Sequence, residues 1–120
     1  MSGHTGVGRR GEALAARYHE RLGLTTIDRN VRLPGGEIDL VMQEGDEIVF
    51  VEVKTRIGDE SLAPDELVTA AKLARLERLA EAYVDRLGTP EASWRIDVVA
   101  IVLGRDGRVV RCDRFVGAFL

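Results

Sequence analysis

Two acids and a lysine lie on either side of a Gly-Asp pair at residues 45–46, at positions where they could meet. A Gly-Asp pair between two apolar runs favours a β-hairpin with a two-residue turn. Counting outward from this turn places Asp39 opposite Glu52 and Glu37 opposite Lys54. Directly opposed like charges repel each other, so a pairing of Asp39 with Glu52 requires an explanation.

A divalent cation shared by Asp39 and Glu52 would supply that explanation. Mg²⁺ is held by one or two carboxylates, keeps several waters and completes its shell with phosphate oxygens. Lys54 follows Glu52 on the same side of the strand, where its ammonium could contact an attacking water and the phosphate. The pattern therefore predicts a Mg²⁺ or Mn²⁺ site suited to hydrolysing phosphodiester bonds. The plain alternative is a solvated strand face with ordinary ion pairs, because motifs as short as Glu-x-Lys give many false matches.

Apolar side chains alternate with these acids and fix which face of the hairpin is buried. One face is expected to carry only apolar residues: Ile38, Leu40, Met42, Val49, Val51 and Val53. The other face is expected to be apolar near the turn, with Val41, Ile48 and Phe50, and charged toward its open end.

The elements that must position this hairpin follow from periodicity and from breaker residues. Their expected order is α-β-β-β-α-β-β: a helix over residues 12–22, strands over 24–33, 37–44 and 47–56, a helix over 64–87, and strands over 96–103 and 108–115. Pro64 is placed to begin the long helix, and Gly23 and Gly88 to end the two helices. The chain is expected to form one α/β domain over residues 1–120, with residues 1–8 frayed.

The 120 residues carry a formal net charge of −3, which argues against a protein that coats DNA by bulk charge. Residues 1–35 are nevertheless basic, with six arginines against three acids, so a local basic face is possible. Cys112 is the single cysteine, which excludes an internal disulfide. No secretory signal or membrane span is visible, and a cytoplasmic protein with no membrane partner is expected.

Two stretches resemble a known signature: residues 36–41, Gly-Glu-Ile-Asp-Leu-Val, and residues 49–56, Val-Phe-Val-Glu-Val-Lys-Thr-Arg. They look like the PD-(D/E)XK nuclease signature and, more narrowly, like the YraN-like family of small bacterial proteins, which is similar to archaeal Holliday junction resolvases. The resemblance extends to Gly11-Glu12, Arg29-Asn30, Lys72 and residues 95–99. The signature's proline has no counterpart directly before Asp39, where Ile38 stands.

The resemblance implies a restriction-endonuclease-like fold, in which helices flank a mixed sheet. It implies Asp39 and Glu52 as metal ligands and catalytic acids, Lys54 as the catalytic lysine and Glu12 as an auxiliary acid. For Glu12, a favourable charge near a helix N-terminus is an equal alternative.

Basic side chains outside the hairpin could contact phosphates. Lys72, Arg75 and Arg78 follow one another at helical spacing, which suits either a phosphate-binding stripe or a solvated helix face. Arg9, Arg10, Arg32 and Arg56 are further candidates whose places cannot be read from the sequence.

Three other features favour structural explanations. Asp97 interrupts an apolar strand and is expected to pair with Arg95 or a backbone donor. Trp94 is expected to anchor the core edge rather than to stack on bases. His4 and His19 lack zinc-ligand spacing with Cys112.

Taken together, these features predict a Mg²⁺- or Mn²⁺-dependent endonuclease that acts on DNA rather than RNA. Branched or structured DNA is expected from the resemblance alone, and a homodimer would allow two sites to cut two strands. The alternatives are a nucleic-acid-binding module of the same fold without catalysis, and a protein-interaction domain.

Overall fold

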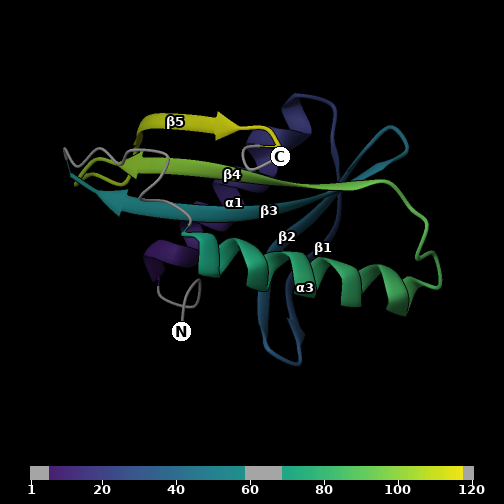
Figure 1. The fold of residues 1–120 in the computed structure, drawn as a ribbon. Helices are drawn as coiled ribbons and strands as arrows, with labels where there is room; N and C mark the ends of the chain where they lie inside the picture. Colours follow the sequence, from purple (N-terminus) through teal and green to yellow (C-terminus); the bar gives the residue numbers. More distant parts are fainter. Residues whose placement is uncertain (1–5, 59–68, 118–120) are drawn as a thin grey trace.

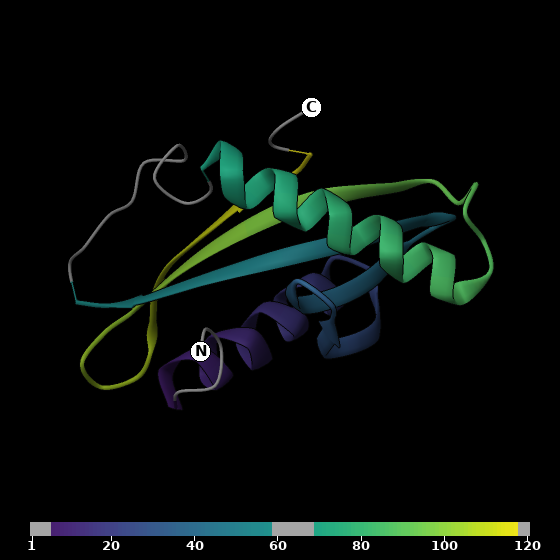
Figure 2. The same cartoon turned by 60° about the horizontal axis from the view of Figure 1, so that its bottom comes forward.

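The computed structural model describes residues 6–58 and 69–117. A five-stranded sheet in the order β1-β2-β3-β4-β5 forms the centre, with one helix on each face (Figures 1 and 2). The elements are α1 (Gly6–Arg21), β1 (Thr25–Leu33), β2 (Gly36–Glu44), β3 (Glu47–Ile57), α3 (Ala70–Leu87), β4 (Trp94–Leu103) and β5 (Val109–Phe115). The predicted α/β class and the order α-β-β-β-α-β-β are confirmed.

One strand pair makes the sheet mixed. β3 and β4 run parallel, whereas β1 and β2, β2 and β3, and β4 and β5 pair antiparallel. Parallel neighbours need a crossover connection, because a tight turn cannot join them. α3 lies in that crossover and covers one face of the sheet, while α1 covers the other (Figure 2).

The start of each helix differs from the prediction. α1 begins at Gly6 rather than at the predicted Glu12, so the helix includes residues 6–8 of the predicted lead; residues 1–5 lie outside the described part. Burial of one face of α1, through Gly11, Ala15 and Ala16 among others, stabilises the helix despite its glycines, since packing contributes more to helix stability than propensity does.

α3 begins at Ala70, after an extended Thr69 whose side chain accepts a hydrogen bond from the Lys72 N–H. Thr69 is therefore an N-cap, and an unbroken helix from Pro64 is wrong at that residue. Residues 64–68 of the predicted helix lie outside the described part. The helix ends at Gly88, whose left-handed conformation agrees with the predicted end.

Two apolar cores fill the spaces between the sheet and the helices. On the α1 side, Leu40, Met42, Val49 and Val51 pack with Ala15, Ala16 and residues of β4. On the α3 side, Val41, Ile48 and Phe50 pack with Leu76, Leu79 and Tyr83. The predicted alternation is thus confirmed for these residues, and Val53 also packs on the α1 side.

Ile38 is the exception to the predicted alternation. It belongs to the α3-side core with Val31 and Leu33, not to the α1-side core with Leu40. Strict alternation holds while two strands pair regularly, and the β2–β3 ladder ends at Leu40. Beyond that point Ile38 pairs only with Val31 of β1 and follows that strand.

Trp94 and Phe50 anchor the α3-side core. The Phe50 ring makes edge-to-face contacts with Tyr83 and with Trp94, each at 5.7 Å between ring centroids. Trp94 is partly buried against this core, which confirms its predicted role. No helix among the described residues has the length and apolar character to cross a bilayer.

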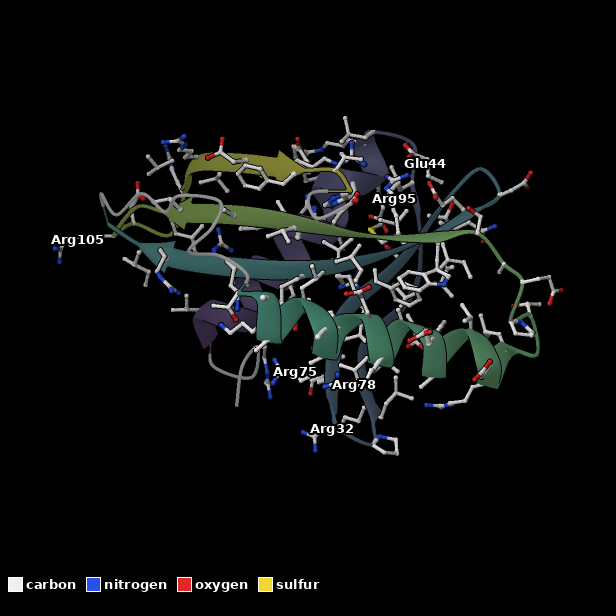
Figure 3. All side chains as sticks on the ribbon, viewed as in Figure 1. Arg32, Glu44, Arg75, Arg78, Arg95 and Arg105 are labelled. Atoms are coloured by element: carbon white, nitrogen blue, oxygen red, sulfur yellow. The ribbon has the colours of Figure 1, made fainter. Side chains whose placement is uncertain are left out.

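Arg95 ties the β2–β3 turn to β4. Its guanidinium contacts Asp97 at 2.9 Å, Glu47 at 2.7 Å and Glu44 at 2.9 Å, and Figure 3 shows Arg95 beside Glu44. Asp97 is fully buried and also accepts a hydrogen bond from the Gly117 N–H at 2.9 Å. The predicted structural pairing of Asp97 is confirmed.

Replacing Arg95 with methionine should lower the free energy of unfolding by about 3–5 kcal/mol, because it leaves the buried Asp97 carboxylate without its main cation. Urea denaturation would measure the loss. Arg108→Met is the matched control, since Arg108 is exposed and lies 3.9 Å from an exposed Asp106; its effect should stay within about 0.5 kcal/mol. Equal losses in the two variants would contradict a structural role for the Arg95 contacts.

Candidate metal centre

Asp39 lies where β2 and β3 separate. The last backbone pair of the ladder is Leu40 with Val51, so the ladder does not extend to the predicted Asp39–Glu52 pair. Instead the Asp39 carboxylate accepts a hydrogen bond from the Val53 N–H at 2.9 Å. A side chain of β2 thus bridges to β3 where backbone pairing stops, and this contact fixes the direction of the carboxylate.

The side chains of Asp39 and Glu52 meet at this separation. The two carboxyl groups lie close enough for Glu52 to perturb the pKa of Asp39, and the two residues are only 5% and 9% exposed. Burial is the largest cause that raises the pKa of Asp39 to about 8, and the charge of Glu52 is the second. The Val53 N–H opposes the rise, because it stabilises the ionised form. The predicted meeting of two acids is therefore present, through side chains rather than through backbone register.

Glu12 brings a third acid to the same place. It is 5% exposed on α1, and its charge also raises the pKa of Asp39. Because α1 begins at Gly6, Glu12 lies beyond the first turn of the helix. The effect of the helix dipole fades within the first turn. A favourable charge near the helix N-terminus, the alternative explanation for Glu12, is therefore not supported.

A close approach of α1 to β3 positions Glu12. A Cβ atom on Gly11 would collide with the side chain of Thr55, so only glycine allows the helix to lie this near the strand. Thr55 is a residue of the site that the sequence analysis did not single out. The available signal was its place two residues after Val53, on the strand face that receives α1.

Lys54 lies against Glu52. Its Nζ is 3.0 Å from the Glu52 Oε2, and its side chain is 17% exposed. Glu37, the predicted cross-strand partner of Lys54, instead lies in register with Arg32 of β1. The Arg32 Nε is 3.5 Å from the Glu37 Oε2. The strand separation at Asp39 accounts for this change of partner.

Lys72 reaches the same site from the first turn of α3. Its pKa is lowered from the usual value, and the largest cause is the charge of Lys54; the charge of Glu52 acts in the opposite direction. The two ammonium groups therefore lie side by side next to a carboxylate. Lys54 and Lys72 are the only lysines of the chain, and every other basic side chain except histidine is arginine.

The remaining predicted phosphate-binding residues are spread over several surfaces. Arg75 contributes to the lowered pKa of Lys72, and Figure 3 shows Arg75 and Arg78 extending from α3 on the same side as Arg32. Arg56 is exposed on β3, and Arg9 is exposed on α1. Arg10 donates two hydrogen bonds to the Gly107 carbonyl, at 2.9 and 2.7 Å, which gives it a structural role at the β4–β5 turn.

The acids of this site fit a hard divalent cation. Burial raises the pKa of Asp39 most, and the charges of Glu52 and Glu12 raise it further; a bound cation would oppose the part that these charges contribute. Oxygen ligands suit Mg²⁺ or Mn²⁺. Within residues 6–58 and 69–117, no three Asp, Glu, His or Cys side chains converge closely enough to hold a metal by themselves. Asp39 and Glu52 are the two that could hold one, together with waters.

Sequence comparisons identify relatives along most of the chain. A model of the uncharacterised protein family UPF0102 matches residues 11–101. The chain belongs to this family. A UPF0102 protein of Symbiobacterium thermophilum is 50% identical over 113 residues, which cover 94% of this chain and 95% of the relative. A UPF0102 protein of Chloroflexus aurantiacus is 48% identical over 113 residues, with 93% and 91% covered. The YraN-like resemblance is confirmed as family membership, and these names state no activity.

The stability of the metal-free protein should fall as pH rises from about 5 to 8. Asp39 keeps its proton in the folded chain up to about pH 8 but loses it near 3.8 when unfolded. Unfolding therefore releases a proton in this range, and the free energy of unfolding decreases by at most about 1.4 kcal/mol per pH unit. Urea denaturation in EDTA at several pH values would measure the slope.

Asp39→Asn is the matched variant for this measurement, because an amide mimics the protonated acid and can still accept from the Val53 N–H. The downward slope should shrink in this variant, and its stability at pH 8 should equal or exceed that of the wild type. A slope that is the same in both proteins would mean that Asp39 does not titrate in this range.

Proposed function

We propose that this protein is a Mg²⁺- or Mn²⁺-dependent nuclease that hydrolyses phosphodiester bonds in DNA. The observation that carries the proposal is the convergence of Asp39, Glu52 and Lys54 at one buried place, with Lys54 3.0 Å from Glu52. Glu12 and Lys72 complete the group. Paired acids followed by a lysine are the residue types that metal-assisted phosphoryl hydrolysis requires.

Each side chain has a separate task. Asp39 and Glu52 hold the cation, which, when bound, lowers the pKa of a water and neutralises charge on the phosphate. Lys54 stabilises the negative charge that develops on the phosphate as the water attacks. Glu12 orients waters around the acids from its buried place on α1.

The choice of lysine at two positions supports this assignment. In a chain that otherwise uses arginine, both lysines lie beside Glu52. Lysine is a compact point charge whose pKa responds to its surroundings, whereas arginine is always charged and binds as a planar fork. A site that needs a small, adjustable cation next to a carboxylate therefore favours lysine.

DNA recognition is supported by the basic side chains around the site. Lys72, Arg75 and Arg78 lie on α3, and Arg56 lies on β3 beyond Lys54. They supply positive charge from two elements on a chain with a net charge of −3, and such charges can position a phosphate backbone. Branched or otherwise structured DNA is the preferred substrate because of the resemblance to Holliday junction resolvases.

A binding module without catalysis explains the site less well. Buried carboxylates repel a phosphate unless a cation lies between them, so a surface that only binds DNA has no use for Asp39, Glu52 and Glu12 together. A protein-interaction domain does not account for two lysines beside these acids. Binding of DNA without cleavage would indicate the first alternative, and binding of neither DNA nor metal would indicate the second.

A cleavage panel tests the activity directly. Linear, flapped and four-way DNA and matched RNA would be incubated with the protein in Mg²⁺ or Mn²⁺ at a fixed, stated salt concentration, because phosphate contacts are strongly salt-dependent. We expect cleavage of DNA that requires the metal, with four-way DNA preferred. Binding of four-way DNA without cleavage in either metal would support the binding module instead.

Lys54→Ala should reduce DNA cleavage by about 100-fold or more, because it removes charge stabilisation in the transition state. Binding of Mn²⁺, measured by calorimetry, and binding of DNA should be retained, whereas Asp39→Asn should lose Mn²⁺ binding as well. Arg105→Ala is the matched control, since it also removes one positive charge, at an exposed residue of the β4–β5 turn (Figure 3). Wild-type cleavage by Lys54→Ala would refute the role given to this lysine.

A further inference from the structure

β5 forms one edge of the sheet and carries unusual apolar exposure. Among the described residues it pairs only with β4, and Figure 1 shows it at the outer margin. Of the seven exposed large apolar side chains in this part of the chain, three lie on β5 or directly after it: Val109, Val110 and Val116. An edge strand presents backbone donors and acceptors that another strand can use.

The two edges of the sheet differ in backbone conformation. On β1 the register shifts between Thr26 and Asp28, and Asn30 has a φ of 49°; bulges and kinks of this kind prevent an edge from pairing. The β4–β5 ladder also shifts once, between Val102 and Leu103, and is regular from Arg111 to Phe115. The regular part of β5 thus covers Arg111 to Phe115, whereas the regular part of β1 contains the positive φ of Asn30.

Opposite charges lie side by side on β5. The Arg111 Nε is 2.6 Å from the Asp113 Oδ2, and both side chains are substantially exposed, at 59% and 38%. The two residues are separated by one position, so they share one face of the strand. If a second β5 strand runs antiparallel to the first, the arginine of each strand can face the aspartate of the other.

Symmetry limits how two copies of β5 could pair. Directly opposed residues of an antiparallel ladder point to the same face of the sheet. The two-fold axis between two β5 strands must therefore lie at one residue, which then faces its own copy, and not between two consecutive residues. An axis through Arg111 or through Asp113 would oppose that residue to itself, and like charges repel. An axis through Cys112 opposes Arg111 of each copy to Asp113 of the other, which forms two attractive pairs.

We propose that β5 is a self-association edge, at which a second copy of this chain adds its own β5 antiparallel in the register centred on Cys112. The result is a two-fold symmetric dimer with one continuous sheet. The proposal does not rest on the nuclease activity, although Arg111 and Asp113 line a hollow together with Lys54.

Charge reversal tests the register. Sedimentation velocity at concentrations up to about 1 mM, the weak end of specific association, should show a dimer for the wild type. Arg111→Asp and Asp113→Arg should each weaken self-association by about tenfold or more, because each opposes like charges twice. An equimolar mixture of these two variants should associate again, because both contacts are then attractive. Arg108→Asp, at an exposed residue of the adjoining turn, is the control and should dimerise like the wild type.

Each other result overturns the proposal. A wild type that stays monomeric at about 1 mM removes the dimer. A dimer that persists in both single variants places the interface elsewhere. Failure of the mixture to associate, while both variants keep the wild-type circular dichroism spectrum, rejects the register. Because Cys112 is the only cysteine, a short thiol cross-linker gives an independent readout: covalent dimer should form in the wild type and fall in both single variants.

Discussion

The hydrogen bond from the Val53 N–H to the Asp39 carboxylate is the contact on which the site depends. β2 separates from β3 beyond Leu40, which makes room for the acid side chains between the strands. β3 must nevertheless stay fixed in place, because it carries Lys54. A side-chain acceptor meets both requirements, because it satisfies a backbone donor that would otherwise be buried without a partner. The same contact holds Asp39 beside Glu52, so strand separation and acid clustering are one feature of the structure.

The two helices complete this arrangement from opposite faces of the sheet. α1 lies close to β3 because Gly11 has no side chain to meet Thr55, and this proximity delivers Glu12. α3 begins at the Thr69 cap, which places Lys72 in its first turn beside Lys54. Each helix therefore contributes one charged side chain from a position that backbone packing defines, rather than from a mobile loop.

Local signals in the sequence predicted most of the fold and half of the site. The hairpin turn at residues 45–46 sets the register from Glu44 to Leu40, as the turn length requires. The same count fails beyond Leu40, because the separation of β2 from β3 depends on tertiary contacts. Counting therefore placed Glu37 opposite Lys54 and Ile38 in the wrong core. The approach of Lys72 and the role of Thr55 are long-range contacts that local periodicity cannot reveal.

The two ends of the β2–β3 hairpin hold acids in different surroundings. At the turn, Glu44, Glu47 and Asp97 gather around Arg95, and each contacts its guanidinium within 3 Å. At the open end, burial and the charges of Glu52 and Glu12 raise the pKa of Asp39 to about 8. An arginine thus pairs with three acids at one end of the hairpin, whereas at the other end the Asp39 carboxyl lies buried beside other acids. Perturbed pKa values are frequent at functional sites, and a divalent cation beside Asp39 would lower its pKa.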